Sequence, residues 1–323
     1  MPCFYHYELD IQKALRKAGA EVYFIDSNIH AHSLWEKLLC FYTTGLRDRM
    51  VYRYYAEKLK EMDAKKHAEI DEVLVIRGQW ITEDVMTLLR RHCPKACFRM
   101  YQWDSVSTFP YQKVLAPFFD RVMTFDPVDS ATYHWALRPL FFKAAECDIR
   151  PERERKYDLI FLCSMHTRRM QILLQLRKIA DRLGKKVFSY IYVPRLQYIR
   201  EALLKQNPLY RGAREALHFQ SLPEEKTREI YNQARVFVDY TFPQQNGLSM
   251  RTIESVGHRC KLVTNNRYVR DTDFYDPANV FLYEGEKLEI PADFLESPYH
   301  VLPEETYQRY SLEGFLAELF SEA

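Results

Sequence analysis

Short apolar runs alternate with amphipathic stretches along most of the chain. In the first half, the apolar runs are rich in β-branched and aromatic residues and predict strands at 73–78, 97–101 and 122–125. A further run at 137–142 contains Pro139, which predicts an edge strand or none. Helical spacing of apolar residues predicts helices at 5–19, 46–70, 83–93 and 126–135. Strands that alternate with helices indicate an α/β fold with a parallel sheet.

The N-terminal pattern departs from this order. The helix at 5–19 ends at Gly19, a C-terminal cap, and only then does 21–26 predict a strand. A nucleotide-binding type of fold has a strand before its first helix, and residues 1–4 are too few to form one. We therefore expect either a chain that starts upstream of Met1 or a first sheet without its first strand.

The composition changes at 143–156, which is charged, holds Pro151 and predicts a linker. The α/β pattern then starts again, with strands predicted at 159–163, 187–193, 217–220, 236–240, 262–264 and 280–283. Helices are predicted at 168–183, 222–234, 250–257 and 303–320. We expect two Rossmann-like domains, residues 1–148 and 149–303, followed by a C-terminal helix, 304–323, that packs back on the first domain.

Composition narrows the class of protein. The 323 residues are 47% hydrophobic and 15% aromatic, which is typical of globular proteins, and the net charge of +2 gives no general reason to expect a nucleic acid or an acidic membrane as partner. We find no apolar run of membrane-spanning length and no signal-peptide pattern. The seven cysteines are scattered and odd in number, which favours free thiols in a reducing compartment. We expect a cytoplasmic protein.

The segment with the most chemistry lies between the strands predicted at 236–240 and 262–264. A polar loop that contains Gly247 leads into a helix, and ligands of open α/β sheets bind at such junctions. Backbone N–H groups at a helix start suit an anion such as a diphosphate, and Gly247 permits close approach of the backbone. Glu254, one turn into the helix, suits a pair of vicinal hydroxyls. The alternative is a capped crossover helix with a surface Arg251–Glu254 ion pair.

This segment resembles the donor-site loop and helix of GT-B glycosyltransferases, in particular the bacterial group of lipopolysaccharide and capsule biosynthesis and the CgeB-like proteins. The matching residues are Gln244, Asn246, Gly247, Ser249, Arg251, Glu254 and 261–264. Weaker resemblance extends to 101–105, 119–126 and 273–280, and so covers most of the chain. The resemblance implies a GT-B architecture, in which two Rossmann-like α/β/α domains face a cleft.

The resemblance also implies roles for particular residues. The donor and its phosphates would be held by Ser164, His166, Arg168, Gln244, Asn246, Gly247, Leu248, Ser249, Arg251 and Glu254. The base of the nucleotide would contact Tyr192 and Pro194, and the acceptor Arg77 and Trp103. Asp104 is the candidate general base, with Glu254 as the second catalytic candidate. The alternatives are a solvated surface for Arg168, core or turn positions for Tyr192 and Pro194, and a helix cap for Asp104 with Ser105.

The sequence lacks the motifs of several other kinds of nucleotide-binding, catalytic and metal sites. The sequence has no Walker-type loop, no G-x-G-x-x-G, no G-x-S-x-G and no H-E-x-x-H. His92, Cys93 and Cys97 lack further zinc ligands at a recognisable spacing, and Asp271 with Asp273 follows no strand. We therefore expect no metal and no cofactor, only a nucleotide-diphosphate sugar as substrate.

The resemblance thus predicts a metal-independent glycosyltransferase. It would move a sugar to a glycan or lipid-linked acceptor of lipopolysaccharide, capsule or exopolysaccharide, with at most peripheral contact at the inner face of the cell membrane. One alternative is a nucleotide-sugar epimerase of the same architecture. The other is a non-catalytic subunit that binds nucleotide sugars, which a missing first strand would favour.

Overall fold

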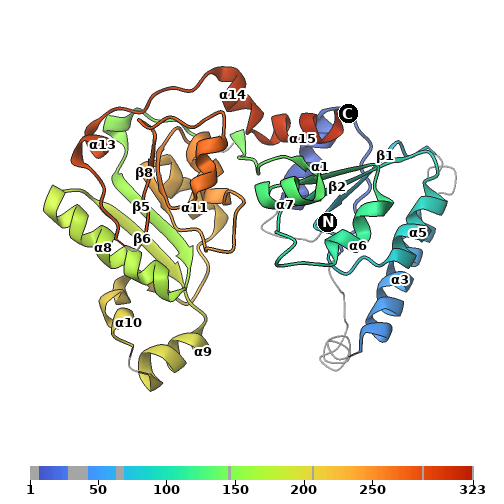
Figure 1. The fold of residues 1–323 in the computed structure, drawn as a ribbon, viewed down its shortest axis with the longest axis horizontal. Helices are drawn as coiled ribbons and strands as arrows, with labels where there is room; N and C mark the ends of the chain where they lie inside the picture. The colour runs from blue at the N-terminus through green and yellow to red at the C-terminus, as the bar shows by residue number, and fades with distance from the viewer. Residues whose placement is uncertain are drawn as a thin grey trace. The chain divides into compact units, whose positions relative to one another are not determined.

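The computed structural model describes residues 7–27, 43–62, 69–144, 147–205, 207–285 and 287–321. The chain forms two compact units: unit 1 consists of Met1–Pro139 with Leu316–Ala323, and unit 2 of Leu140–Phe315. Each unit contains one sheet, and every strand pairing found among the described residues is parallel. Figure 1 shows the helices packed on these sheets. The prediction of two Rossmann-like α/β units is confirmed.

The sheet of unit 1 has the order β1-β2-β3-β4. Its strands are β1 (Glu72–Ile76), β2 (Cys97–Gln102), β3 (Arg121–Thr124) and β4 (Ala136–Leu137). Its helices are α1 (Tyr7–Lys17), α3 (Thr44–Glu61), α5 (Glu83–His92), α6 (Gln112–Leu115), η1 (Ala116–Phe118) and α7 (Pro127–Tyr133). Asp126 caps α7 by accepting from the backbone N–H groups of Val128 and Asp129, with Pro127 at the first helical position, as the sequence predicts.

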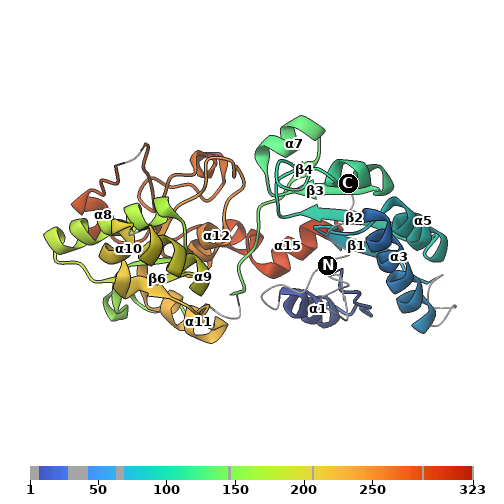
Figure 2. The ribbon, with the colours of Figure 1, turned by 90° about the horizontal axis from the view of Figure 1, so that it is seen from below.

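Strand β2 shows how unit 1 is layered, because successive side chains of a strand point to opposite faces. Phe98 and Met100 pack with α3 and α5 in one core (Figures 1 and 2). On the opposite face, the Arg99 guanidinium donates to the backbone oxygens of Leu319 and Ser321 at the end of the chain, both at 3.1 Å. The C-terminal residues therefore complete the sheet's second face.

Two local predictions fail. The segment 21–26 forms no strand within the described part of the chain, although Ile25 packs against the unit 1 core. The helix predicted at 303–320 is two helices, α14 (Glu304–Arg309) and α15 (Leu312–Phe320). They part where the backbone of Phe142 bonds to Tyr310 O and Leu312 N, at 2.8 and 2.9 Å. Residues 1–4, on which the missing-strand expectation rests, lie outside the described residues.

The sheet of unit 2 has the order β10-β9-β8-β5-β6-β7. Its strands are β5 (Tyr157–Ser164), β6 (Val187–Tyr192), β7 (Leu217–His218), β8 (Ala234–Asp239), β9 (Lys261–Thr264) and β10 (Val280–Leu282). Its longer helices are α8 (Thr167–Leu183), α11 (Glu224–Asn232) and α12 (Met250–Gly257). Shorter helices are η3 (Glu152–Glu154), α9 (Arg195–Tyr198), η4 (Ile199–Leu204), α10 (Pro208–Gly212), η5 (Arg214–Ala216), η6 (Arg267–Asp271) and α13 (Ala292–Glu296).

Helices cover both faces of this sheet. Helix α8 buries Met170, Leu173 and Leu176 in a core that includes Phe161 of β5 and Val238 of β8. It ends at Gly184, whose φ of 63° lies in the left-handed region, as the sequence predicts for this cap. The other face is covered by α11 and α12: the ring of Tyr231 packs on that of Phe237, and α12 lies against β8 and β9. In the part of the chain that the structure describes, no helix is both long and apolar enough to cross a membrane.

Candidate functional site

The strand order of unit 2 reverses between β5 and β8. From β5 the chain proceeds to β6 and β7 on one side, whereas β8, β9 and β10 follow on the other. In open α/β sheets such a switch point leaves a crevice at the carboxyl ends of the two strands, where ligands bind. In this sheet, two segments lie at the switch point: 164–167, which follows β5, and 240–249, which follows β8. These segments contain most of the predicted donor-site residues.

The loop before α12 is held by two asparagines from the end of β9. The Asn266 amide donates to the backbone oxygens of Asn246 and Gly247, at 3.1 and 3.2 Å. The Asn265 amide bonds both the N–H and the C=O of Thr241, at 2.8 and 2.9 Å. The polar loop is therefore pinned near both ends by backbone hydrogen bonds. These asparagines are not among the site residues predicted from the sequence, although two adjacent amides directly after a strand are a recognisable signal.

Asp239, the last residue of β8, is the polar centre beneath the start of α12. Its carboxylate is fully buried, accepts from Ser249 Oγ at 2.6 Å and pairs with Arg251 Nε at 2.8 Å. Ser249 also caps α12 by accepting from the Thr252 N–H. Burial alone raises the pKa of Asp239, but the Arg251 charge and these hydrogen bonds outweigh it and hold the pKa below its ordinary value. Ser249 and Arg251 are thus fixed by a residue that the sequence analysis did not select.

Arg169 lies at the switch point as a buried cation. Its guanidinium donates to the backbone and side-chain oxygens of Ser164 and to Tyr240 O, and it stacks on the Phe242 ring at 4.5 Å. Among the described residues it has no ion-pair partner, and its buried Nε has no hydrogen-bond partner. Burial, followed by the nearby charge of Arg251, lowers the pKa of Arg169. The charge of Asp239 also acts on Arg169, but that carboxylate pairs with Arg251. The Arg169 guanidinium between the ends of β5 and β8 is therefore still a strong local attraction for an anion.

His166 and Arg168 lie beside Arg169 at the start of α8. His166 caps the helix, because its Nδ1 accepts from the Arg168 N–H at 3.2 Å, and its ring contacts Phe242 edge-on. Burial and then the charge of Arg169 lower the pKa of His166, which favours the neutral imidazole that a cap acceptor requires. The Arg168 side chain donates to Gln171 and, at 3.4 Å, to Gly285 O. The structure thus brings His166 and Arg169 to the Phe242 ring, whereas the Arg168 side chain points to Gln171 and Gly285.

Glu254 and Arg251 do not form the ion pair that their spacing allows. Arg251 pairs with Asp239, and Glu254 lies 3.6 Å from Nε2 of His258, whose ring is buried between Tyr231 and Phe237. The Glu254 side chain keeps 14% of its surface exposed. A role for Glu254 in binding hydroxyls stays a prediction.

The remaining predicted donor residues lie at the same edge of the sheet. Ser164 ends β5 directly beside Tyr192, its register partner at the end of β6, and Pro194 is the exposed residue before α9. Gln244 is exposed in the loop, and Leu248 is buried beneath it. Their proposed contacts with a nucleotide stay predictions.

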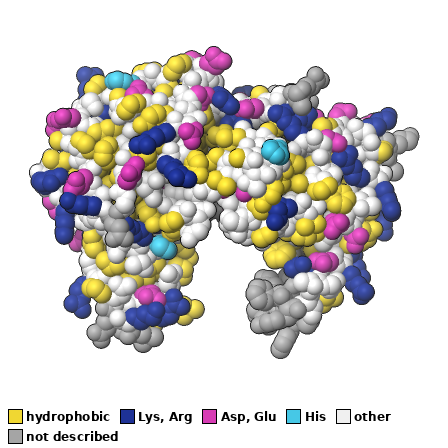
Figure 3. Space-filling view, in the orientation of Figure 1, with side chains coloured by type: hydrophobic (Ala, Val, Ile, Leu, Met, Phe, Trp, Pro, Cys, Tyr) yellow, Lys and Arg dark blue, Asp and Glu magenta, His cyan; other side chains and the backbone are white. Residues whose placement is uncertain are grey.

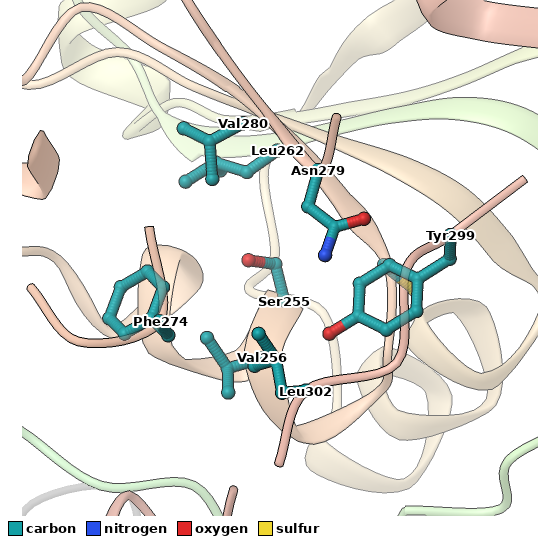
Figure 4. A pocket seen from close by; sticks show the side chains of 9 residues that line it. Ser255, Val256, Leu262, Phe274, Asn279, Val280, Tyr299 and Leu302 are labelled. Atoms are coloured by element: carbon teal, nitrogen blue, oxygen red, sulfur yellow. The ribbon is translucent and has the colours of Figure 1, made fainter. Parts of the chain in front are cut away.

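A small cavity behind α12 is a packing void rather than this site (Figure 4). It leaves about 220 Å³ of space, part of it open to solvent, between Ser255, Val256, Val280 and the Tyr299 ring. Asn279 also faces it, but its amide is engaged by the backbone of His300 at 2.7 and 2.8 Å. None of the predicted site residues lines this cavity.

A second candidate site lies at the carboxyl ends of β1 and β2 in unit 1. Arg77 Nε lies 2.9 Å from the Asp104 carboxylate, and the guanidinium stacks on the Phe109 ring at 4.4 Å. Arg77 has a φ of 67°, a left-handed backbone conformation that a non-glycine residue adopts at a cost of about 1–3 kcal/mol. Such strain clusters at functional sites. Trp103 is half-buried next to Asp104.

The environment of Asp104 does not match that of a helix cap. The next helix, α6, begins at Gln112 with Tyr111 at its N-cap, and the Ser105 hydroxyl donates to Asp126 instead. Burial raises the pKa of Asp104 above its ordinary value, although the charge of Arg77 opposes this. A half-buried carboxylate with a raised pKa suits a general base better than an ordinary surface aspartate does.

Within the described residues, no group of three or more His, Cys, Asp or Glu side chains is placed to hold a metal ion. Asp273 of the Asp271–Asp273 pair instead contacts Arg309 and the Tyr310 hydroxyl. Metal independence stays a prediction.

No protein-family model matches the chain, and no curated protein matches it. Among solved structures, a chain of the GtfA/B complex is 14% identical with a TM-score of 0.49, and the match covers 83% of this chain but only 60% of that one. A glycosyltransferase from Rickettsia africae is 9% identical with a TM-score of 0.48, with 96% and 88% covered. An alpha-glucosyltransferase in complex with UDP and DNA is 10% identical with a TM-score of 0.47, with 82% and 78% covered.

Proposed function

We propose that this protein is a glycosyltransferase of GT-B type that moves a sugar from a nucleotide-diphosphate donor to an acceptor hydroxyl. The observation that carries the proposal is the buried guanidinium of Arg169 at the switch point of a parallel sheet, which has no ion-pair partner among the described residues. A diphosphate supplies the missing negative charge, and Arg is the residue best suited to two phosphate oxygens. The resemblance of 242–264 to donor-site segments supports the same ligand.

In this proposal unit 2 holds the donor. The diphosphate lies between Arg169, His166 and the N–H groups at the start of α12, while Glu254 accepts from the ribose hydroxyls. Tyr192 and Pro194, at the end of the neighbouring strand, contact the base. Catalysis then rests on positioning and on stabilising the charge that develops on the departing diphosphate, with no metal required.

Unit 1 holds the acceptor in this proposal. Arg77 and Trp103 contact it, and Asp104 accepts the proton of the attacking hydroxyl. The resemblance implies a precursor of lipopolysaccharide, capsule or exopolysaccharide as the acceptor, at the cytoplasmic side of the membrane.

The test is a thermal-shift screen of the whole chain against nucleosides and their mono- and diphosphates. A ligand that binds only the native state stabilises it by about 2.7 kcal/mol at a concentration 100 times its dissociation constant. We expect diphosphates to stabilise the protein more than monophosphates, and nucleosides to have little effect. Equal responses to all three would overturn the diphosphate site.

Incubation with the preferred nucleotide sugar then separates the possible activities. Sugar transferred to an added glycan acceptor is the expected result. An isomerised free donor would instead identify an epimerase. Donor binding with neither product, across a broad panel of acceptors, would identify a non-catalytic subunit.

A further inference from the structure

A helical stretch in unit 2 presents apolar side chains to solvent. Helix α9 continues directly into η4, so that residues 195–204 form one stretch, and η4 is a π-helix, a rare form often found at functional sites. Its inner face is anchored: Tyr198 and Ala202 pack against the core, and the Gln197 amide donates to the Met165 sulfur at 3.0 Å. On the outer face, Leu196 is 82% exposed and Ile199 45% exposed.

Phe219 adds an aromatic ring beside this stretch. It is 43% exposed, packs edge-on against the Tyr198 ring at 5.1 Å and lies 5.9 Å from the Arg195 guanidinium. We call Leu196, Ile199 and Phe219 the α9 patch. Leu196 is more exposed than any other large hydrophobic side chain among the described residues. The outer face of a surface helix is ordinarily polar, so the patch indicates a partner with apolar groups.

The same segment has a local excess of basic residues. The connection from Pro194 to Ala216 has five basic residues and two acidic ones, a net charge of +3, whereas the whole chain carries only +2. The basic residues, all exposed, are Arg195, Arg200, Lys205, Arg211 and Arg214. Glu201, one of the two acids, is occupied by Arg200 and Lys205, each at 3.0 Å. On the part of the surface where Figure 1 places α9 and α10, Figure 3 shows Lys and Arg side chains interspersed with hydrophobic ones.

We propose that the α9 patch docks on an anionic phospholipid bilayer. Basic side chains that flank exposed aliphatic and aromatic ones are the combination that binds a helix in the headgroup region of such a membrane. A nucleic acid would use the basic residues but leave Leu196 and Ile199 exposed to water. A bilayer uses both, because the aliphatic groups enter the acyl boundary while the guanidinium groups stay among the phosphates.

Co-sedimentation with vesicles tests the proposal. Vesicles of phosphatidylcholine alone are compared with vesicles that also contain phosphatidylglycerol, using the full chain. We expect binding to the anionic vesicles only, weakened by added salt because the charge contribution is screened. The double variant Leu196→Ser/Ile199→Ser should lower the partition coefficient by about 100-fold, or about tenfold for each aliphatic side chain lost. Arg195→Gln and Arg200→Gln should each lower it about fivefold.

Val301→Ser is the matched control, because Val301 is 69% exposed in the same unit but lies outside the patch. It should leave vesicle binding unchanged, and thermal melts of every variant check that the fold persists. Three results would overturn the proposal: no binding to anionic vesicles, an equal loss in Val301→Ser, or a wild-type dimer in light scattering that the double variant dissociates. The last result would assign the patch to a second copy of the chain.

Discussion

Replacing Asp239 by Asn isolates the charge on which the start of α12 depends. Asn keeps the shape and one acceptor oxygen but leaves the Arg251 guanidinium without its partner carboxylate, 2.8 Å away. Removing one member of a buried ion pair costs about 3–5 kcal/mol, because the other charge remains uncompensated. Asp239 is fully buried, whereas 25% of the Arg251 side chain is exposed and keeps some hydration. We therefore expect the lower end, about 3 kcal/mol.

Scanning calorimetry measures this change. A 323-residue chain with two compact units need not unfold in one step, so the transition of unit 2 is the quantity to follow. For a unit of about this size, 1 kcal/mol shifts Tm by about 2–4 °C, so Asp239→Asn should lower Tm by about 6–12 °C at neutral pH. Glu229→Gln, which breaks an exposed pair with Lys226, is the control and should leave the transition unchanged.

The pH dependence gives an independent check. Because the pKa of Asp239 in the folded state is below its ordinary value of 3.8, its contribution is complete above pH 3.8 and disappears as pH falls through the folded-state pKa. The difference in Tm between wild type and Asp239→Asn should therefore be constant near neutrality and shrink in acid. A shift of less than about 2 °C at neutral pH, or one that persists unchanged in acid, would refute the reasoning.

Three further predictions concern the two candidate sites. Asp104→Asn should lower turnover by about 10²–10⁴-fold without changing donor affinity. The wild-type rate should rise with pH through a pKa above 3.8, because a general base acts when it is deprotonated. Full activity of the variant in steady-state assays would remove Asp104 from the mechanism. Glu254→Gln should weaken nucleotide-diphosphate binding by roughly tenfold or more, because bonds to a charged acceptor contribute about 1.5–3 kcal/mol; unchanged affinity in titration calorimetry would leave Glu254 only its contact with His258. Asn266→Ala leaves the backbone oxygens of two loop residues without their donor, so amide hydrogen exchange in 242–249 should become roughly tenfold faster. Equal exchange rates in the wild type and the variant would show that Asn266 does not hold the loop in place.

Local signals in the sequence predicted most of the fold. Asp126–Pro127 and Gly184 bound helices where the sequence places them, because capping depends on a few adjacent residues. Predictions that needed a distant partner failed. The segment 21–26 has the composition of a strand but forms none among the described residues, because strand formation depends on distant parts of the chain as well as on local composition. The helix predicted at 303–320 is broken by a bridge to Phe142, which periodicity cannot reveal.

The candidate site shows the same limit. Residues close in sequence, such as His166 and Arg168, were selected together and do lie together. Arg251 was assigned a possible partner three residues away, whereas its partner is Asp239, twelve residues earlier, on the strand that α12 covers. Arg169 directly follows Arg168 in the sequence, and only burial distinguishes these two arginines.

Unit 1 is discontinuous in the chain, and this affects the order in which the protein is completed. Arg138, which is fully buried, pairs with Glu318, and Arg99 bonds the backbone of Leu319 and Ser321. A ribosome therefore finishes every residue of unit 2 before it supplies these partners, although unit 1 begins the chain. Until then Arg138 is made without Glu318, and Arg99 without these two backbone acceptors. A fragment cut at Pro139 would keep both arginines but discard the C-terminal residues that they contact, so the two units are not separable by a single cut.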